Sequence, residues 1–288
     1  YFHIKHARWG GQTLYELYRK AYTPWEWFVD LKKASRDSGL IFFATAFDKT
    51  SVDFLEGLDV PFHKISSFEL VDIPLIEYAA KTKKPLILST GMATLNEISE
   101  ALSVARASGN GEVVLLKCVS SYPARPDGMN LRTIPDMRKR FNVPVGLSDH
   151  SLGIAASVAA VCMGAIMVEK HFTLSKKDES VDSFFSIDTV GLKELVDGIR
   201  CAEKALGKVH YGLTGEDGEG HLFRRSLFAA EDIRKNQIFT EKNVRSVRPS
   251  GGLPPKHIYD VIGRKAKKDI RKGTPLRWEL VGREGRRI

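Results

Sequence analysis

The chain repeats one pattern six times: a short apolar run, followed by a longer stretch with helical periodicity. Near-continuous apolar runs are typical of parallel strands that are buried on both faces. Repeated strand–helix units of this kind predict an α/β fold, either a doubly wound sheet or a (β/α)8 barrel. The expected strands are residues 40–47, 62–68, 85–90, 113–120, 143–148 and 165–172.

Helical stretches connect these strands. Residues 95–108 and 154–163 have the periodicity of helices, and Thr94 precedes Glu97 by three positions, which is the spacing of a capping box. A long amphipathic helix is expected over residues 188–206.

Six units are two fewer than a closed barrel needs. At ~30 residues for each strand–helix–strand unit, two further units would take very roughly 60 residues. The chain opens on Tyr1 rather than on Met. We therefore expect a TIM-barrel domain over residues 1–206 whose first two βα units are missing.

The pattern changes after this region. Residues 207–223 are rich in glycine and are expected to form a linker. Residues 224–282 show short strands and turn signals, which predict a small β-rich domain. Two similar segments, EDIRK at 231–235 and KDIRK at 268–272, suggest internal pseudo-symmetry in that domain.

The composition excludes several classes of protein. Hydrophobic residues make up 43% of the chain and charged residues 27%, which excludes a disordered chain. No apolar run approaches the ~18–20 residues of a membrane helix. The three cysteines are widely spaced and form no CxxC pair, which argues against a disulfide scaffold and a zinc cluster. We expect a cytoplasmic protein that does not engage a membrane.

The positive charge lies in the last fifth of the chain. The formal net charge is +9, and residues 224–288 hold 18 Lys and Arg against 7 Asp and Glu, so the remainder is slightly acidic. Such an excess is typical of a solvated basic surface, and it also suits a module that closes over an anionic ligand. Nucleic-acid binding is disfavoured because no nucleic-acid motif accompanies the charge.

Polar residues gather where the predicted strands end. In a parallel barrel, the reactive side chains come from the carboxyl ends of the strands. One polar ending is unremarkable, but six consecutive endings able to bind phosphate, carboxylate or metal indicate a site. They comprise Thr45, Lys64, Ser67, Glu69, Ser89, Thr90, Ser120, Tyr122, Ser148, Asp149, His150, Glu169 and His171.

His150 and His171 end neighbouring predicted strands, so their imidazoles are placed to converge. A single histidine at a strand end is more often structural, but two imidazoles with one or two oxygens suit a divalent ion such as Mn²⁺. Lys64 would be costly to bury unless an anion pairs with it. Together with the serine hydroxyls it would form a phosphate cradle, whereas Cys118 is expected in the core.

Several strings resemble known families. KISSFE (64–69), ILSTGMA (87–93), LLKCVSSYP (115–123), VGLSDHSLG (145–153) and VEKHFTL (168–174) resemble the sialic acid synthase family. RRSLFAAEDI (224–233), NVRSVRPSGGLPP (243–255) and IGRKAKKDIRKGTPL (262–276) resemble its antifreeze-like (SAF) domain. TLYELYRKAYTPWEW (13–27) is similar to the pseudaminic acid synthase branch. Neither the EIGxNH-like nor the VKFQ-like motif of the family's first strands is present.

The resemblance implies an enzyme that condenses phosphoenolpyruvate with an N-acetylated amino sugar, and for this branch 2,4-diacetamido-2,4,6-trideoxy-L-altrose. It implies a divalent metal, with Mn²⁺ expected ahead of Mg²⁺ or Co²⁺, and a domain-swapped homodimer. The implied catalytic residues are Glu69, Lys64 and Asp182, and the implied metal ligands are His150 and His171. The implied substrate-binding residues are Thr45, Ser67, Ser89, Ser120, Tyr122, Ser148 and Arg248.

Other functions stay open at this point. The chain could act on another sugar of the same family, as an N-acetylneuraminic or legionaminic acid synthase or a spore-coat polysaccharide synthase. A metal-dependent aldolase or a deoxy-sugar-acid phosphate synthase would share the barrel but lack the SAF module. A non-catalytic carbohydrate- or ice-binding protein is the third class, although ice binding favours flat faces of low charge.

Overall fold

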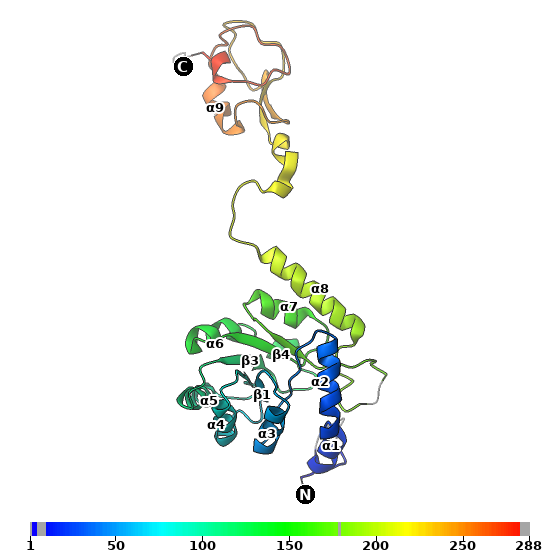
Figure 1. The fold of residues 1–288 in the computed structure, drawn as a ribbon. Helices are drawn as coiled ribbons and strands as arrows, with labels where there is room; N and C mark the ends of the chain where they lie inside the picture. The colour runs from blue at the N-terminus through cyan, green and yellow to red at the C-terminus, as the bar shows by residue number, and fades with distance from the viewer. Residues whose placement is uncertain (1, 5–9, 178–179, 283–288) are drawn as a thin grey trace. The chain divides into compact units, whose positions relative to one another are not determined.

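The structure is a computed structural model, and it describes residues 2–4, 10–177 and 180–282 of the chain. The chain divides into two compact units, Tyr1–Gly207 and Lys208–Ile288. Each unit has its own hydrophobic core, so each is a domain in the physical sense (Figure 1).

The first unit is built on a parallel sheet with the strand order β1-β2-β3-β4-β5. Its strands are β1 (His63–Ile65), β2 (Leu86–Ser89), β3 (Val113–Cys118), β4 (Val145–Asp149) and β5 (Val168–Lys170). Its helices are α1 (Leu14–Ala21), α2 (Phe28–Asp37), α3 (Lys49–Gly57), α4 (Ile73–Lys81), α5 (Leu95–Ala107), α6 (Thr133–Phe141), α7 (Ala155–Cys162) and α8 (Thr189–Leu206). The alternation confirms the predicted α/β class, and Figure 1 shows the sheet with helices along its outer side.

The first predicted strand is wrong in extent. Residues 40–47 form no ladder strand: Thr45 makes a single parallel bridge to Lys64, and the Ala46 amide donates to the Lys64 carbonyl at 3.0 Å. The segment therefore lies beside β1 but pairs with it at one point. The other strands are shorter than predicted because their polar ends, such as Ser67 and Ser120, leave the ladder and enter loops.

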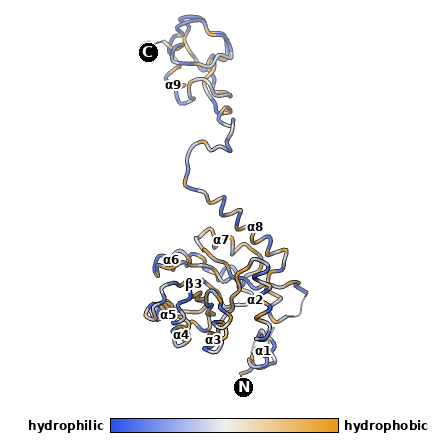
Figure 2. The backbone as a smooth tube through the Cα atoms, in the orientation of Figure 1, coloured by the Kyte–Doolittle hydropathy of each residue, from blue (hydrophilic) through white to orange (hydrophobic). Residues whose placement is uncertain are grey.

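The helix boundaries agree with the sequence signals. Thr94 caps α5, and its side chain and that of Glu97 form the reciprocal capping box. Asp188 caps α8 by accepting the Gly191 amide at 2.9 Å. Figure 2 shows hydrophobic and hydrophilic positions mixed along α8, as an amphipathic helix requires.

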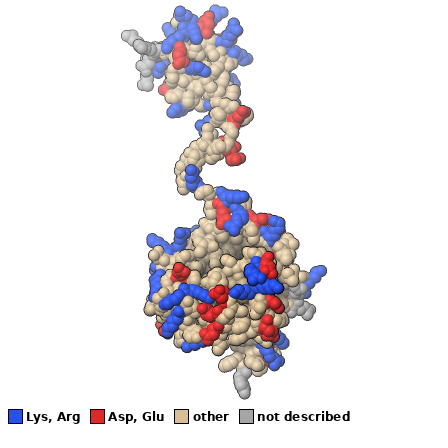
Figure 3. Space-filling view, in the orientation of Figure 1, with Lys and Arg blue, Asp and Glu red and all other residues tan. Residues whose placement is uncertain are grey.

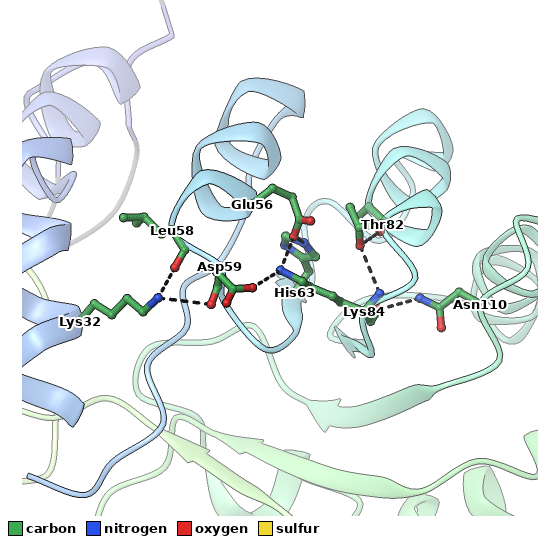
Figure 4. A network of polar contacts seen from close by, with 9 residues as sticks. Lys32, Glu56, Leu58, Asp59, His63, Thr82, Lys84 and Asn110 are labelled. Carbon is green, nitrogen blue, oxygen red and sulfur yellow. Dashed lines mark hydrogen bonds and ion pairs between the residues drawn. The ribbon is translucent and has the colours of Figure 1, made fainter.

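A polar network ties the amino-terminal ends of the first strands together (Figure 4). His63 is fully buried, and its Nε2 lies 2.8 Å from Glu56 Oε1. Lys84 Nζ lies 3.0 Å from the same carboxylate oxygen and 3.3 Å from Asp59 Oδ1. Lys32 of α2 donates to the Leu58 carbonyl at the end of α3. The network therefore joins α2, α3, β1 and the loop before β2 at the end of the sheet opposite the predicted site.

We expect His63 to make the protein less stable in mild acid. Burial lowers the pKa of His63 from 6.5, and the hydrogen bond to Glu56 only partly opposes this. The unfolded chain therefore binds the proton more readily, so stability is lost as the pH falls below about 6.5.

Urea unfolding between pH 5 and 8 measures this effect in the wild type and in His63→Gln. The wild type should show the steeper pH dependence, with the difference in slope bounded by about 1.4 kcal/mol per pH unit for one proton. Equal slopes would show that His63 titrates alike in both states.

The second unit is small and rich in β-structure. Its strands β6 (Ser226–Ala229) and β7 (Val244–Val247) pair antiparallel, and α9 (Ile258–Val261) follows. The Gly-rich stretch before it contains a 3-10 segment, Gly215–Phe223. Further short 3-10 segments in the two units are Trp25–Trp27, Pro126–Gly128, Pro255–His257 and Trp278–Leu280. On the face drawn in Figure 3, Lys and Arg outnumber Asp and Glu in this unit.

The predicted pseudo-symmetry of the second unit is confirmed. Ile233 and Ile270 exchange both backbone hydrogen bonds, at 2.8 and 2.7 Å. Asp269 Oδ1 accepts the amide of Lys235 at 2.6 Å. The equivalent aspartate of the other repeat, Asp232, accepts the amide of Lys272 at 2.7 Å. An aspartate of each repeat therefore accepts a backbone hydrogen bond from the other repeat.

None of the helices within the described ranges is both long enough and apolar enough to cross a membrane.

Candidate functional site

Lys64 is a buried cation at the carboxyl end of β1. Its side chain is 3% exposed, and its Nζ donates to the Ile65 carbonyl at 3.0 Å. Glu169 Oε2 lies 3.6 Å from Nζ. Burial lowers the pKa of Lys64, and the Glu169 carboxylate opposes this shift. A buried ammonium with one weak ion pair is well suited to receive an anionic ligand.

Glu169 is a site residue that was expected at a strand end, with no role predicted for it. The ladder pairs Ser148 with Glu169, and Ser148 Oγ donates to Glu169 Oε1 at 2.7 Å. Its carboxylate therefore connects Ser148 with Lys64. The signal available in the sequence was its position two residues before His171, which places both side chains on one face.

Two buried hydroxyls point to a ligand. Ser89 Oγ and Ser120 Oγ are buried, and neither has a hydrogen-bond partner among the residues that the structure describes. Leaving a buried hydroxyl unsatisfied costs about 1–3 kcal/mol. Both hydroxyls belong to the predicted phosphate cradle, so a bound anion would supply the missing partners.

Gly91 lies between the hydroxyls of this cradle. Its amide donates to Ser67 Oγ at 3.1 Å. A Cβ at this position would lie 2.3 Å from Ser120 Oγ and 2.6 Å from Ser67 Cβ, too close for either atom to stay in place. Gly91 was not predicted as a site residue, because a glycine after a strand is an ordinary turn signal.

Thr45 and Glu69 flank Lys64. Thr45 forms its bridge to Lys64 and is half-buried. Glu69 is half-buried and accepts a hydrogen bond from Ser66 Oγ. The structure thus brings both predicted residues to the same end of β1.

The two histidines lie side by side. Their ring centroids are 5.3 Å apart. His150 is 6% exposed, and its Nδ1 lies 2.9 Å from the Val119 carbonyl, to which it can only donate. His171 Nδ1 lies 3.4 Å from Asp182 Oδ2. With both Nδ1 atoms engaged, the Nε2 atoms are the nitrogens left to bind a ligand.

Aromatic rings hold the imidazoles in place. Tyr122 packs on His150 with centroids 4.5 Å apart. Phe185 is 2% exposed and lies 4.7 Å from the His171 ring and 5.2 Å from the Tyr122 ring. Burial is the main cause that raises the pKa of Tyr122 to about 12, so its hydroxyl stays protonated at neutral pH. Phe185 was not predicted as a site residue from the sequence.

Asp182 and Phe185 come from one turn after β5. The Asp182 carbonyl accepts the amides of Phe185 at 3.3 Å and Ser186 at 3.2 Å. The turn is anchored to the strand end, because the Ile187 amide donates to the His171 carbonyl at 2.7 Å. Asp182 thus faces His171.

Arg248 belongs to the second unit, after β7, and is exposed. The other predicted residues, from Thr45 to Asp182, belong to the first unit. Within the described ranges, no cluster of three or more His, Cys, Asp or Glu residues is arranged to hold a metal ion. His150 and His171, whose ring centroids are 5.3 Å apart, are the candidate nitrogen donors.

Comparison with known proteins shows the family of the chain. The model of the NeuB family matches residues 1–211, and that of the SAF domain matches residues 224–282. Pseudaminic acid synthase of Campylobacter jejuni is 44% identical over 96% of this chain and 80% of its own length. Pseudaminic acid synthase of Helicobacter pylori is 41% identical over 96% of this chain and 81% of its own length.

A solved structure supports the fold. The spore coat polysaccharide biosynthesis protein spsE of Bacillus subtilis superposes with a TM-score of 0.62, at 32% identity, over 95% of this chain and 82% of that one. A DAHP synthase of Thermotoga maritima, at 21% identity and a TM-score of 0.59, shares the fold over 65% of this chain. The parallel sheet is thus part of a TIM-barrel-like fold, and the chain belongs to the NeuB family, with an SAF domain as its second unit.

Proposed function

We propose that the protein is a pseudaminic acid synthase. It condenses phosphoenolpyruvate with 2,4-diacetamido-2,4,6-trideoxy-L-altrose and water, and releases phosphate. Its relation to the Campylobacter and Helicobacter enzymes supports the sugar. The observation that carries the phosphoenolpyruvate assignment is the pair of buried, unpartnered hydroxyls, Ser89 and Ser120, in the same site as the buried Lys64.

Phosphoenolpyruvate occupies the cradle in this proposal. Lys64 offsets the charge of the phosphate and carboxylate groups. The hydroxyl groups that contact phosphoenolpyruvate belong to Thr45, Ser67, Ser89, Ser120 and Ser148. Holding the two reactants face to face at a barrel mouth contributes a large share of catalysis, since a bimolecular step becomes effectively unimolecular.

The proposed metal site consists of His150 and His171. Two neighbouring imidazoles whose Nδ1 atoms are both engaged fit a borderline divalent ion, with the remaining positions left to water or substrate. Mn²⁺ is the proposed ion, to be compared with Mg²⁺ and Co²⁺. When bound, such an ion polarises a carbonyl oxygen as a Lewis acid.

The proposed reaction forms one C–C bond and breaks the C–O bond to phosphate. The methylene carbon of phosphoenolpyruvate forms a bond to the aldehyde carbon of the open-chain sugar, whose oxygen takes up a proton. Water adds to the neighbouring carbon and loses a proton, for which Glu69 is the proposed acceptor. The C–O bond to phosphate then breaks. Tyr122 and Asp182 contact the sugar, and the product is a nine-carbon α-keto acid.

The function test measures phosphate release by the full-length enzyme from phosphoenolpyruvate with each of three sugars. We expect a preference of at least about tenfold in kcat/KM for the diacetamido-trideoxy altrose over N-acetylmannosamine, because a site built to bind a polar group rejects analogues that lack it. The legionaminic acid precursor, a diacetamido-trideoxy mannose, is the third arm. Preference for either alternative would move the protein to that branch, and no release with any sugar would refute the condensation.

We also propose that the enzyme is a domain-swapped homodimer in which Arg248 of one chain completes the site of the other. The glycine-rich stretch before the SAF domain is long enough to act as a flexible linker. The positive charge lies in the SAF domain, whereas the site must hold a trianion. An arginine offers this anion a permanently charged, planar fork.

Mixing two inactive variants tests the domain-swapped arrangement. Arg248→Ala and His150→Ala should each be inactive, and their mixture should regain up to about a quarter of wild-type activity, because a random swapped heterodimer contains one site with both residues intact. Subunit exchange is verified with differently tagged chains. A mixture that exchanges but stays inactive would contradict the swapped arrangement.

A further inference from the structure

A buried ion pair lies directly behind the two histidines. Asp149 precedes His150, Lys170 precedes His171, and the ladder pairs Asp149 with Lys170. Lys170 Nζ lies 2.9 Å from Asp149 Oδ2, and the two side chains are 5% and 0% exposed. Successive side chains along a strand point to opposite faces, so the pair lies on the face opposite the imidazoles.

The contacts of Asp149 show which face this is. Ser157 of α7 donates to Asp149 Oδ2 at 2.5 Å, so the carboxylate faces the helix that packs on β4. Asp149 Oδ1 accepts both the amide and the hydroxyl of Ser151, at 2.8 and 2.7 Å. These contacts to Ser157 and Ser151 therefore tie the strand end to the loop and helix that follow it.

Lys170 completes the clamp around His150. Its Nζ donates to the Ser151 carbonyl at 2.7 Å as well as to Asp149. The residues on both sides of His150 are thus anchored to each other, and the same cation directly precedes His171. A change in the distance between these groups would alter the spacing of the two imidazoles.

We propose that Asp149 and Lys170 are a positioning pair that sets the spacing of His150 and His171. The inference rests on the metal site of the proposed function. A buried ion pair is costly to desolvate and often adds no stability over an apolar pair, so its place between two ligand-bearing strand ends is better explained by geometry. Removing a group that orients a metal ligand typically weakens metal binding by 10- to 100-fold.

The test measures Mn²⁺ affinity by titration calorimetry in the full-length enzyme without substrates, with phosphoenolpyruvate affinity and the thermal midpoint measured on the same samples. Asp149→Asn should weaken Mn²⁺ binding by about tenfold or more. It should leave phosphoenolpyruvate affinity within about twofold of the wild type. Lys64 and the other cradle hydroxyls lie on or after other strands, and the Ser148 side chain points to the face of β4 opposite that of Asp149. Combining Asp149→Asn with Lys170→Met should cost little more than the weaker-binding single variant, since both residues act through one pair.

Two further variants make the result decisive. Glu56→Gln disturbs the polar network at the opposite end of the sheet and should leave Mn²⁺ affinity unchanged. Ser157→Ala removes only one hydrogen bond to Asp149; it replaces Asp149→Asn if that variant fails to fold, and should weaken Mn²⁺ binding to a smaller extent.

The possible outcomes separate the hypotheses. Wild-type Mn²⁺ affinity in folded Asp149→Asn, or in Ser157→Ala where Asp149→Asn does not fold, would overturn the positioning role. Equal loss in Glu56→Gln would overturn it as well, because general destabilisation would then explain the effect. A wild type that binds no Mn²⁺ would refute the metal site together with this inference. A wild type that binds Mn²⁺ but forms no product would refute the proposed reaction alone.

Discussion

Replacement of His150 or His171 by alanine is expected to lower turnover by at least about 10³-fold while the fold is retained, because a Lewis acid contributes several kcal/mol to transition-state stabilisation. The imidazoles are the two nitrogen donors of the proposed site, with centroids 5.3 Å apart. His150 is 6% exposed, so His150→Gln, which preserves more volume, accompanies His150→Ala. Product formation is measured against Mn²⁺ concentration in the full-length enzyme.

A histidine outside the site provides the control. His210 is exposed and belongs to the second unit, and His210→Ala should behave as the wild type does. Circular dichroism and the thermal midpoint report on the fold of each variant. Wild-type turnover in a folded His150 or His171 variant would remove these residues from the metal site.

Gly91→Ala should reduce kcat/KM by about 10²-fold, which is the typical cost of moving catalytic groups by about 1 Å. The new methyl group would lie 2.6 Å from Ser67 Cβ and 2.3 Å from Ser120 Oγ, so the hydroxyls of the proposed cradle must move apart. The larger part of the loss should appear as weaker phosphoenolpyruvate binding, measured by calorimetry. Mn²⁺ affinity should change little, because the histidines directly follow β4 and β5.

Gly111→Ala is the matched control. A Cβ at Gly111 would meet nothing within 4 Å, so this variant should keep wild-type phosphoenolpyruvate affinity and activity. If Gly91→Ala binds phosphoenolpyruvate as tightly as the wild type, the cradle does not lie around Gly91.

Much of the fold was predictable because it depends on local signals. Apolar runs alternating with helical stretches are enough to indicate parallel strands, and the capping box at Thr94 marked the start of α5. The paired EDIRK and KDIRK segments predicted the pseudo-symmetric unit that Ile233 and Ile270 close. Residues 40–47 were the exception, because ladder pairing depends on neighbours that a local pattern does not reveal.

The positions of the candidate site residues were predictable for the same reason, but their contacts were not. In a parallel sheet the carboxyl ends of the strands meet at one edge, so Lys64, Ser89, Ser120, His150 and His171 were identified by position alone. Their contacts could not be read in this way. The Val119 carbonyl that holds His150 carries no side-chain signal, and Phe185 resembles any other core aromatic.

The sequence by itself therefore determined which residue types reach the mouth of the barrel, because strand periodicity and strand direction are local properties. The tertiary structure alone decided how they act on one another. It showed that Glu169 joins Lys64 to Ser148 and that Gly91 makes room for two hydroxyls. Such contacts join residues far apart in the chain, and their geometry depends on how neighbouring strands and loops pack.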